Sequence, residues 1–396
     1  MPITRMTDLS LKNKRVLIRE DLNVPIKNGV VTSDSRIQAA IPTIREALKA
    51  GAKVMIMSHL GRPEEGVRDP QFSLAPVAAY LSKHLREIPL IENWVDGFSM
   101  NTHQIVLLEN VRFNHGEIDN ERDLARKMAK LCDVFVMDAF ATAHRAEAST
   151  CGIIEFAPIA CAGPLLIKEL EALTKIMQKP AKPVVAIVGG SKVSTKLSLL
   201  EALVQKVDYL IVGGGIANTF IAAEGYSVGK SLYEPDLIDE AERLCMMAKN
   251  RGAEIVVPTD VIVGEKLSEE SESAVRLVSQ IDDLEKVYDI GPDTIKHLTS
   301  IIKKAKTILW NGPVGAFEID QFSEGTRAIA KTVADSPGFS VAGGGDTLAA
   351  IEAYGVEKDI NYISTGGGAF LSFIEGTPLP SIVALEARAT RDEHIT

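Results

Sequence analysis

The feature that most constrains the fold is a repeated alternation between short apolar runs and amphipathic helical stretches. Each run is rich in Val, Ile, Leu or Met and ends in polar residues or in glycine. Continuous apolar runs that alternate with helices are typical of parallel sheets covered by helices on both faces. A chain of 396 residues is also too long for one ordinary core. The sequence therefore predicts an α/β protein with two doubly wound, Rossmann-like parallel-sheet domains.

The apolar runs fall into two groups. The first half contains VLIRED (16–21), KVMIMSH (53–59), QIVLLEN (104–110) and DVFVMDAF (133–140). The second half contains PVVAIVGG (183–190), DYLIVGGG (208–215), EIVVPTD (254–260), KTILWNG (306–312), FSVAGGG (339–345) and NYISTGGG (361–368). Between the groups, residues 163–178 have helical apolar spacing, and KPAKP (179–183) ends that helix. We expect an N-terminal domain at 1–165, a connecting hinge helix at 166–183, a C-terminal domain at 184–380, and a tail at 381–396 that returns to the N-terminal domain.

Polar and basic residues follow the apolar runs of the first half. Ligands of open α/β sheets bind outside the carboxyl ends of the strands, so these residues are candidate contacts. They are Asp21, Asn23, Arg36, His59, Arg62, Arg112 and Arg145. Any single arginine at such a place can equally be a solvated surface ion pair. Basic residues at several strand ends together favour an anion that carries phosphate, with a carboxylate as a second group.

Glycines follow the runs of the second half. The clusters are Gly189-Gly190, Gly213-Gly214-Gly215, Gly343-Gly344-Gly345 and Gly366-Gly367-Gly368. Glycine lets backbone N–H groups approach a phosphate, and the helix that follows offers its own unpaired N–H groups. One such cluster is weak support, because strand-to-helix turns use glycine for their own reasons. Four clusters on one sheet favour a floor for a nucleotide.

Two lysines and one aspartate sharpen this interpretation. Lys192 and Lys196 follow Gly190, and we expect them on the first helical turns, sharing one face. Cations at a helix start are unfavourable unless an anion binds there. Asp346 follows the third glycine cluster and has two readings. It is either the N-cap of the next helix or a ligand of Mg²⁺ beside a bound polyphosphate.

Composition and missing motifs exclude several classes. The net charge of −10 argues against a nucleic-acid binder. The longest apolar-rich stretch, at 151–167, contains Glu155 and is too short for a membrane span, and the N-terminus shows no apolar signal segment. The four cysteines lack metal-binding spacing and are expected to be reduced core thiols. GYSVGKS (225–231) has one residue too few between its glycines for a Walker A loop. We expect a cytoplasmic protein.

These segments together resemble the phosphoglycerate kinase family. The resemblance runs in the family's order over roughly residues 15–370. It is carried by RVLIREDLNVP, SHLGRP, LENVRFNHGE, MDAFATAHRAEAS, GGSKVSTK, VGGGIANTF, WNGPVGAFE, GGGDT and STGGGA. SHLGRP, WNGPVGAFE and GGGDT in combination are highly specific. Ala141 stands where the family usually has glycine, and Glu147 occupies a variable position. We expect neither residue to touch a charged contact.

The resemblance implies the glycolytic reaction in which 1,3-bisphosphoglycerate and ADP give 3-phosphoglycerate and ATP, reversibly and with Mg²⁺. It implies that the N-terminal domain binds phosphoglycerate through Asp21, Asn23, Arg36, His59, Arg62, Arg112 and Arg145. It also implies that the C-terminal domain binds the nucleotide through Lys196, Glu318, Gly344, Gly345, Asp346 and Thr347, with Gly213 and Gly214 near the adenine. Asp346 would meet the metal, and Lys192 would lie near the phosphates. We expect a monomer with small-molecule partners only.

The implied mechanism is simple in physical terms. The nucleophile in the ATP-consuming direction is a carboxylate, which is already ionised at neutral pH. No general base is required, which agrees with the lack of an obvious His–Asp pair at these motifs. Catalysis then rests on alignment and on neutralising the transferring phosphoryl, for which we assign Arg36 and Lys196, with Lys192 nearby. Glu318 is expected to bind a ribose hydroxyl. Hinge closure near 163–183 would bring the substrates together.

Two other classes stay open at this point. The first is a different acyl-phosphate kinase, such as one that acts on acetate or carbamate, whose substrates carry less charge. The second is a two-lobed protein that binds an anion without chemistry.

Overall fold

The structure is a computed structural model that describes residues 3–100 and 103–393. The chain divides into two compact units. Unit 1 contains the chain up to Glu171 and again from Pro378 onward, and unit 2 contains Ala172–Thr377. The division falls inside helix α5 (Pro164–Met177), which covers the predicted helical stretch.

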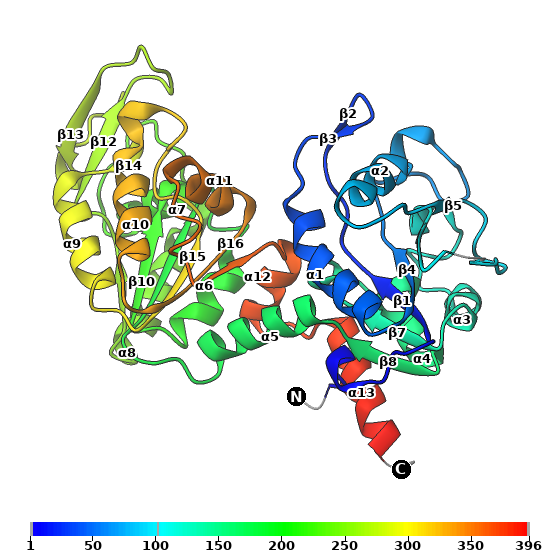
Figure 1. The fold of residues 1–396 in the computed structure, drawn as a ribbon. Helices are drawn as coiled ribbons and strands as arrows, with labels where there is room; N and C mark the ends of the chain where they lie inside the picture. Colours follow the sequence, from blue (N-terminus) through cyan, green and yellow to red (C-terminus); the bar gives the residue numbers. More distant parts are fainter. Residues whose placement is uncertain (1–2, 101–102, 394–396) are drawn as a thin grey trace. The chain divides into compact units, whose positions relative to one another are not determined.

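Unit 1 is built on a six-stranded sheet in the order β5-β6-β4-β1-β7-β8, with all neighbours parallel (Figure 1). Its strands are β1 (Arg15–Arg19), β4 (Lys53–Met57), β5 (Leu90–Ile91), β6 (Ile105–Leu108), β7 (Val134–Met137) and β8 (Ile159–Ala162). A short antiparallel hairpin joins β2 (Ile26–Lys27) to β3 (Val30–Val31). The central strands are buried along nearly their whole length, because helices cover both faces.

The helices of unit 1 bury one apolar side each against this sheet. They are α1 (Ser35–Lys49), α2 (Ala75–His84), α3 (Arg122–Lys130), α4 (Ile153–Phe156) and α13 (Pro380–Glu393). Short turns of helix lie at Met6–Asp8, Pro70–Phe72, Val111–Phe113, Phe140–Thr142 and Ala148–Gly152. Ile37, Ile41 and Ile44 of α1 share a core with Ile18 and Ile56 of the strands. Helix α13 contacts α4 and β8 of the same unit.

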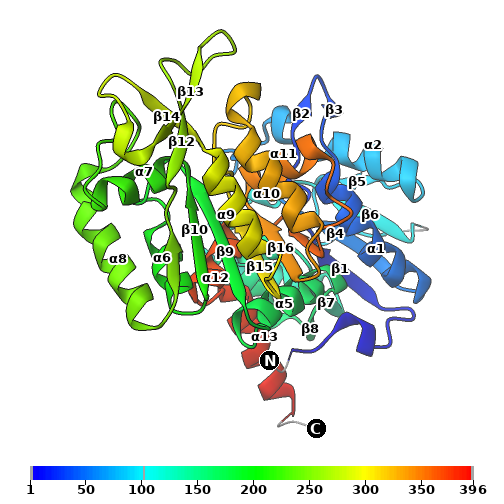
Figure 2. The same ribbon diagram turned by 90° about the vertical axis from the view of Figure 1, so that its left-hand side faces the viewer.

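Unit 2 contains a second parallel sheet of six strands, in the order β11-β10-β9-β15-β16-β17 (Figure 2). The strands are β9 (Val184–Gly190), β10 (Tyr209–Gly213), β11 (Glu254–Val256), β15 (Thr307–Asn311), β16 (Phe339–Gly343) and β17 (Tyr362–Ser364). The first three strands in chain order run outward from β9 on one side, and the last three run outward from β15 on the other. This is the doubly wound order with its switch point between β9 and β15.

The helices of unit 2 cover both faces of this sheet. They are α6 (Leu197–Val204), α7 (Gly214–Ala223), α8 (Ile238–Asn250), α9 (Pro292–Ile302), α10 (Glu324–Ala334), α11 (Gly345–Tyr354) and α12 (Gly368–Glu375), with short turns at Pro235–Leu237, Val278–Gln280 and Asp320–Phe322. Helices α9 and α10 pack together in front of the sheet in Figure 2, while α6 and α12 pack together behind it. The predicted α/β class with two parallel sheets is therefore confirmed.

A three-stranded antiparallel sheet in unit 2 was not predicted. Its order is β13-β12-β14, and its strands are β12 (Asp260–Gly264), β13 (Ser273–Leu277) and β14 (Lys286–Ile290). Strand β13 alternates between exposed and half-buried residues instead of forming a continuous apolar run. Such a strand leaves no continuous apolar run in the sequence, which is why it was not predicted.

Within the described residues, no single helix is both long and apolar enough to cross a bilayer, and only the interrupted pair of α12 and α13 meets the criteria of length and composition.

Candidate active site

The candidate site residues of unit 1 follow the carboxyl ends of β1, β4, β6 and β7. These strands are parallel neighbours or near neighbours in one sheet, so their carboxyl ends meet at one edge. Arg36 is the second residue of α1, the helix that follows β1. The fold therefore brings the predicted residues of the first half to the same edge.

Arg36 is held by the loop that follows β1. Its Nη1 lies 3.1 Å from Oδ2 of Asp21 and donates to the backbone oxygen of Asn23 at 2.8 Å. The side-chain oxygen of Asn23 accepts from the backbone N–H of Gly61 at 2.9 Å. Asp21 and Asn23 thus fix the guanidinium and join it to the loop after β4, where Arg62 follows Gly61. Arg36 keeps a third of its side chain exposed, so it can still meet a ligand.

His59 lies beneath this group and is almost fully buried. Its Nδ1 is 4.0 Å from Oδ1 of Asp21 and 3.4 Å from Nη2 of the buried Arg19. Burial lowers the pKa of His59 well below its ordinary value, and the positive charges of Arg19, Arg112, Arg145 and Arg36 lower it further. The expectation that no His–Asp pair lies at these motifs needs correction, although this imidazole is neutral at pH 7.

Arg112 and Arg145 share a partner that the sequence did not suggest. Nη2 of Arg112 donates to Oε1 of Glu147 at 2.9 Å, and Nη1 of Arg145 lies 3.8 Å from the same oxygen. Arg112 also donates to the backbone oxygen of Gly61 at 2.7 Å. Both members of the Arg112–Glu147 pair are nearly buried. The expectation that Glu147 touches no charged contact is wrong, because the fold brings Arg112 to it from 35 positions away in the sequence.

Arg62 differs from the other predicted residues of this edge. It is exposed, and within the described residues it forms no hydrogen bond or ion pair. Arg19, in contrast, was not predicted and lies at the centre of the group, where its Nε donates to Oγ of Ser149 at 2.9 Å. It was missed because it lies inside the apolar run of β1 and not after it. A charged residue within a buried strand was the available signal.

In unit 2, Lys196 lies at the switch point of the sheet. Its Nζ donates to the backbone oxygen of Gly189 at 2.5 Å, where β9 ends, and to Oδ1 of Asn311 at 2.7 Å, where β15 ends. Burial lowers the pKa of Lys196 from 10.5 to about 8, while the carboxylate of Asp346 acts in the opposite direction. With this pKa, the side chain of Lys196 is mostly charged at neutral pH. A nearby anion would stabilise the charged form further.

The local structure around the two lysines corrects the sequence interpretation. Residues 191–196 form a turn, and α6 begins only at Leu197, so Lys192 and Lys196 do not share a helical face. The turn is fixed by Glu234, which accepts from the backbone N–H and the hydroxyl of Ser194 at 2.8 and 2.6 Å. Lys192 is exposed, whereas Lys196 points inward.

The glycine clusters serve two purposes. A Cβ at Gly189 would lie 1.7 Å from the carbonyl oxygen of Pro313, so this glycine is required by packing alone. Gly213 is likewise pressed against Val314, and Gly214 against the backbone of Gly190. A Cβ at Gly345 would meet nothing within 4 Å. The floor available to a ligand is thus narrower than the four clusters suggested, and Gly345 belongs to it.

The first turn of α11 separates the roles of its residues. The N-cap is Gly344, and Asp346 is the second helical residue, so the N-cap reading of Asp346 is wrong. Its side chain is exposed. Thr347 is buried, and its hydroxyl accepts from the N–H of Gly312 at 2.7 Å and donates to the oxygen of Gly343 at 2.9 Å. Glu318 is exposed, after the turn that follows β15.

Comparison with known proteins shows to which family the chain belongs. The family model described as phosphoglycerate kinase matches residues 6–377. The phosphoglycerate kinase of Nitratidesulfovibrio vulgaris (strain DSM 19637 / Miyazaki F) is 58% identical over 392 residues, which are 99% of this chain and 100% of that protein. The chain belongs to the phosphoglycerate kinase family. The resemblance found in the sequence is confirmed.

Solved structures agree with the family assignment. Phosphoglycerate kinase from Coxiella burnetii is 54% identical, with a TM-score of 0.95 over 98% of this chain and 100% of that one. Phosphoglycerate kinase from Pyrococcus horikoshii OT3 is 33% identical, with a TM-score of 0.81 over the same shares. Phosphoglycerate kinases are transferases that carry out phosphoryl transfer in glycolysis.

The residues of this site limit how a metal ion could be bound. Over the described ranges, no group of three or more His, Cys, Asp or Glu side chains is arranged to hold an ion. Asp346 offers one exposed carboxylate at the start of α11, near Lys196. Mg²⁺ usually takes one or two carboxylates and completes its shell with water and substrate phosphates. The residues therefore fit a Mg–nucleotide complex and not a resident metal cage.

Proposed function

We propose that this chain catalyses the reversible transfer of a phosphoryl group from 1,3-bisphosphoglycerate to ADP, giving 3-phosphoglycerate and ATP. The observation that carries the proposal is the convergence of Arg19, Arg36, Arg112 and Arg145 on the buried His59. A neutral imidazole surrounded by guanidinium groups is a strongly positive environment, and it suits a substrate with a phosphate and a carboxylate. Asp21 and Glu147 balance part of this charge, and acetate or carbamate would engage less of the remainder than a substrate with two anionic groups.

The residues of unit 1 bind and orient the phosphoglycerate in this proposal. Asp21 and Asn23 set the position of Arg36, and Arg112 and Arg145 share one carboxylate, that of Glu147, between two guanidinium groups. One cation of that pair is therefore available to a substrate anion. Arg62 is exposed and free to reach the same ligand, and His59 donates or accepts as a neutral ring.

The residues of unit 2 bind the nucleotide in this proposal. Lys196 meets the phosphates, with Lys192 farther out. The backbone of Gly344-Gly345, which is open at Gly345, and the start of α11 receive the phosphate chain. Thr347 contributes by fixing that backbone, since its hydroxyl is already bonded internally. Gly213 and Gly214, at the end of β10, lie near the adenine in this proposal. The exposed Glu318 binds a ribose hydroxyl. Arg36 and Lys196 are the groups that neutralise the transferring phosphoryl.

Mg²⁺ bound with the nucleotide would neutralise phosphate charge, and Asp346 is its protein contact in this proposal. The nucleophile in the reverse direction is the ionised carboxylate of 3-phosphoglycerate, so no protein group has to remove a proton. We further propose a cytoplasmic monomer, because the proposed contacts to each substrate come from a single unit of one chain. Size-exclusion chromatography with light scattering tests the monomer.

The activity is tested by measuring ATP formation from ADP and freshly generated 1,3-bisphosphoglycerate, with acetyl phosphate and carbamoyl phosphate as alternative donors. We expect turnover with 1,3-bisphosphoglycerate and none comparable with the smaller donors. Equal turnover with acetyl phosphate would reassign the substrate, and no ATP with any donor would point to a binding protein.

The metal contact is tested with Asp346→Asn. We expect this variant to bind Mg–ADP much more weakly than the parent while binding metal-free ADP nearly as well. The side chain has no capping role to lose, because Gly344 is the N-cap. Calorimetry with and without Mg²⁺ measures both affinities. Equal losses in the two titrations would remove Asp346 from the metal.

A further inference from the structure

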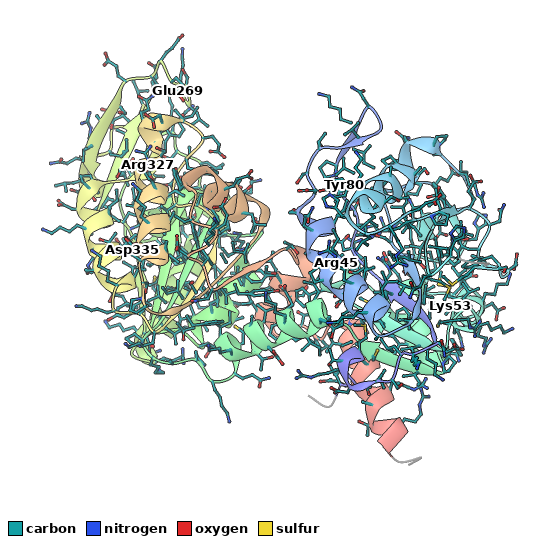
Figure 3. All side chains as sticks on the ribbon, in the orientation of Figure 1. Arg45, Lys53, Tyr80, Glu269, Arg327 and Asp335 are labelled. Atoms are coloured by element: carbon teal, nitrogen blue, oxygen red, sulfur yellow. The ribbon has the colours of Figure 1, made fainter. Side chains whose placement is uncertain are left out.

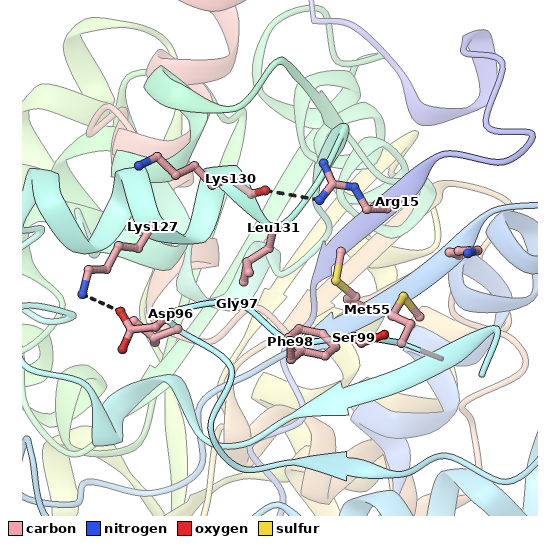
Figure 4. Close-up of a pocket in the computed structure, with 12 residues that line it drawn as sticks. Arg15, Met55, Asp96, Gly97, Phe98, Ser99, Lys127, Lys130 and Leu131 are labelled. Atoms are coloured by element: carbon pink, nitrogen blue, oxygen red, sulfur yellow. Dashed lines mark hydrogen bonds and ion pairs between the residues drawn. The ribbon is translucent and has the colours of Figure 1, made fainter. Parts of the chain in front are cut away.

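A pocket of unit 1 lies away from all the residues discussed so far. It has a volume of about 530 Å³ and is formed where β1 and β4 begin, beside the end of α3 and the loop that contains Phe98 (Figure 4). Arg15 and Lys53 are the first residues of these two strands and are direct partners in the sheet. The proposed phosphoglycerate contacts follow the carboxyl ends of the same strands, so this pocket lies at the opposite edge of the sheet.

Four cations line the pocket, and they come from three separate elements. Lys127 pairs with Asp96 of the lining at 2.8 Å, and Arg15 pairs with Asp133 at 2.8 Å. Lys53 and Lys130 also line it, and in the described part of the chain their ammonium groups have no hydrogen-bond or ion-pair partner. Figure 3 labels Lys53 on unit 1, close to the place where Figure 1 labels α3. Two positive charges are thus uncompensated in a protein whose net charge is −10.

Apart from Asp96 and Ser99, the rest of the lining is apolar. Met55 and Leu131 are buried side chains that form part of the wall, and Phe98 and Met100 are half-buried. Figure 4 shows Phe98 and Met55 side by side, below the strand end that carries Arg15. Methionine adapts to irregular shapes and makes favourable contacts with aromatic rings. The wall therefore suits a flat apolar group, while the lysines suit an anion.

The start of the loop that closes the pocket is anchored by two contacts. Nε1 of Trp94 donates to the backbone oxygen of Glu109 at 2.9 Å, and Asp96 is held by Lys127. Trp94 is buried, so the loop start is fixed to the sheet. Anchoring the start of the loop lowers the conformational entropy that would be lost when a ligand binds against it.

We propose that this pocket is a binding site for a small organic anion with an aromatic or other flat apolar part, held between the Phe98 and Met55 wall and the ammonium groups of Lys53 and Lys130. The volume falls in the range of ordinary small-molecule sites. The site is separate from the proposed catalytic residues, so a test of this binding site does not depend on the proposed function.

Phenyl phosphate is the probe, and the whole chain carries ¹³C-methyl-labelled methionine for NMR. Met55 and Met100 report on the pocket. Met57 and Met137 end their strands at the opposite edge and report on binding there. Each signal is assigned with a Met→Leu substitution, which conserves volume.

We expect saturable shifts of the Met55 and Met100 methyl signals, with an affinity that falls as salt is raised. The double variant Lys53→Ala, Lys130→Ala should weaken binding by about tenfold or more, because two charge-assisted contacts are lost. The matched double variant Lys49→Ala, Lys83→Ala removes two exposed lysines elsewhere in unit 1 and should change nothing. Phenol and inorganic phosphate should each bind more weakly than phenyl phosphate.

Three outcomes would overturn the proposal. The first is the absence of saturable shifts at Met55 and Met100, including the case in which only Met57 and Met137 respond. The second is equal weakening by both double variants, and the third is binding of phenol as tight as that of phenyl phosphate. Unchanged thermal unfolding of each variant confirms that the comparison is made on folded protein.

Discussion

Arg36 has the strongest claim to a direct catalytic role at the residue scale, because Asp21 and Asn23 hold it while part of its side chain stays exposed. We expect Arg36→Ala to lower kcat by about 10³ or more, as for other arginines that neutralise a transferring phosphoryl. The dissociation constant for ADP, measured by calorimetry, should stay within about twofold, since the proposed nucleotide contacts lie in unit 2.

Arg45→Ala is the matched control for that experiment. Arg45 lies on the same helix and is exposed, with its guanidinium bonded to the backbone oxygen of His84. Its removal should leave kcat unchanged. If Arg36→Ala instead abolished ADP binding and kept kcat, the assigned role would be wrong.

Glu147 is the residue whose importance the sequence concealed. Its substitution by Gln leaves the nearly buried guanidinium of Arg112 without an ionic partner, and breaking such pairs is far more costly than breaking exposed ones. We expect Glu147→Gln to reduce the free energy of unfolding by about 1–3 kcal/mol. Glu155→Gln, which breaks the exposed pair with Arg122, should cost less than about 1 kcal/mol.

Thermal and urea unfolding measure both substitutions. The stabilisation by 3-phosphoglycerate should be larger in Glu147→Gln than in the parent, because the substrate then supplies the missing negative charge. Equal and small losses for the two variants would show that Glu147 is merely peripheral.

At the scale of elements, Lys196 lies where the ends of β9 and β15 meet, and its protonation is expected to change when a nucleotide binds. Burial lowers the pKa of Lys196 to about 8, against the opposing effect of the Asp346 carboxylate, so above pH 8 the side chain is mostly neutral in the free protein. A bound anion favours the charged form and raises this pKa. Nucleotide binding above pH 8 must then take up protons, and the uptake should vanish below about pH 7, where Lys196 is already charged.

We expect ADP binding at pH 8.5 to take up about half a proton or more, measured from the dependence of calorimetric heat on the ionisation enthalpy of the buffer. Lys196→Arg should abolish the uptake, because arginine stays charged throughout this range. Lys192→Arg is the control and should preserve it, since Lys192 is exposed. Uptake that survives in Lys196→Arg would assign the proton to another group.

The elements also show how far the sequence could be interpreted. The two parallel sheets were predictable because their strands are buried on both faces and appear in the sequence as continuous apolar runs. The polar residues that follow those strands could then be predicted as well. The start of α6 could not be predicted, because Glu234 fixes Ser194 across 40 positions of sequence. The contacts of Glu147 and Asn311 were hidden for the same reason. Each depends on a partner that only the folded chain brings near.

At the scale of the whole molecule, each unit has its own sheet, its own core and its own set of proposed ligand contacts. All seven proposed phosphoglycerate contacts belong to unit 1, and all proposed nucleotide contacts belong to unit 2. A ligand that touches one unit can stabilise only that unit directly. The chemistry, however, needs both ligands at once, and the chain passes between the units twice, within α5 and between Thr377 and Pro378.

In-line transfer requires the reacting atoms to be about 3–3.5 Å apart. We therefore predict that the pair of ligands, and neither ligand alone, drives a hinge movement near residues 163–183. The pair 3-phosphoglycerate and Mg–ADP cannot react with each other, so it holds the fully liganded state during a measurement. Small-angle X-ray scattering should show a smaller radius of gyration with this pair and little change with either ligand by itself. The Arg36→Ala variant, which loses a contact to the reacting group, should compact less than the parent. Full compaction with Mg–ADP alone, or none with both ligands, would show that closure is not coupled to the two substrates.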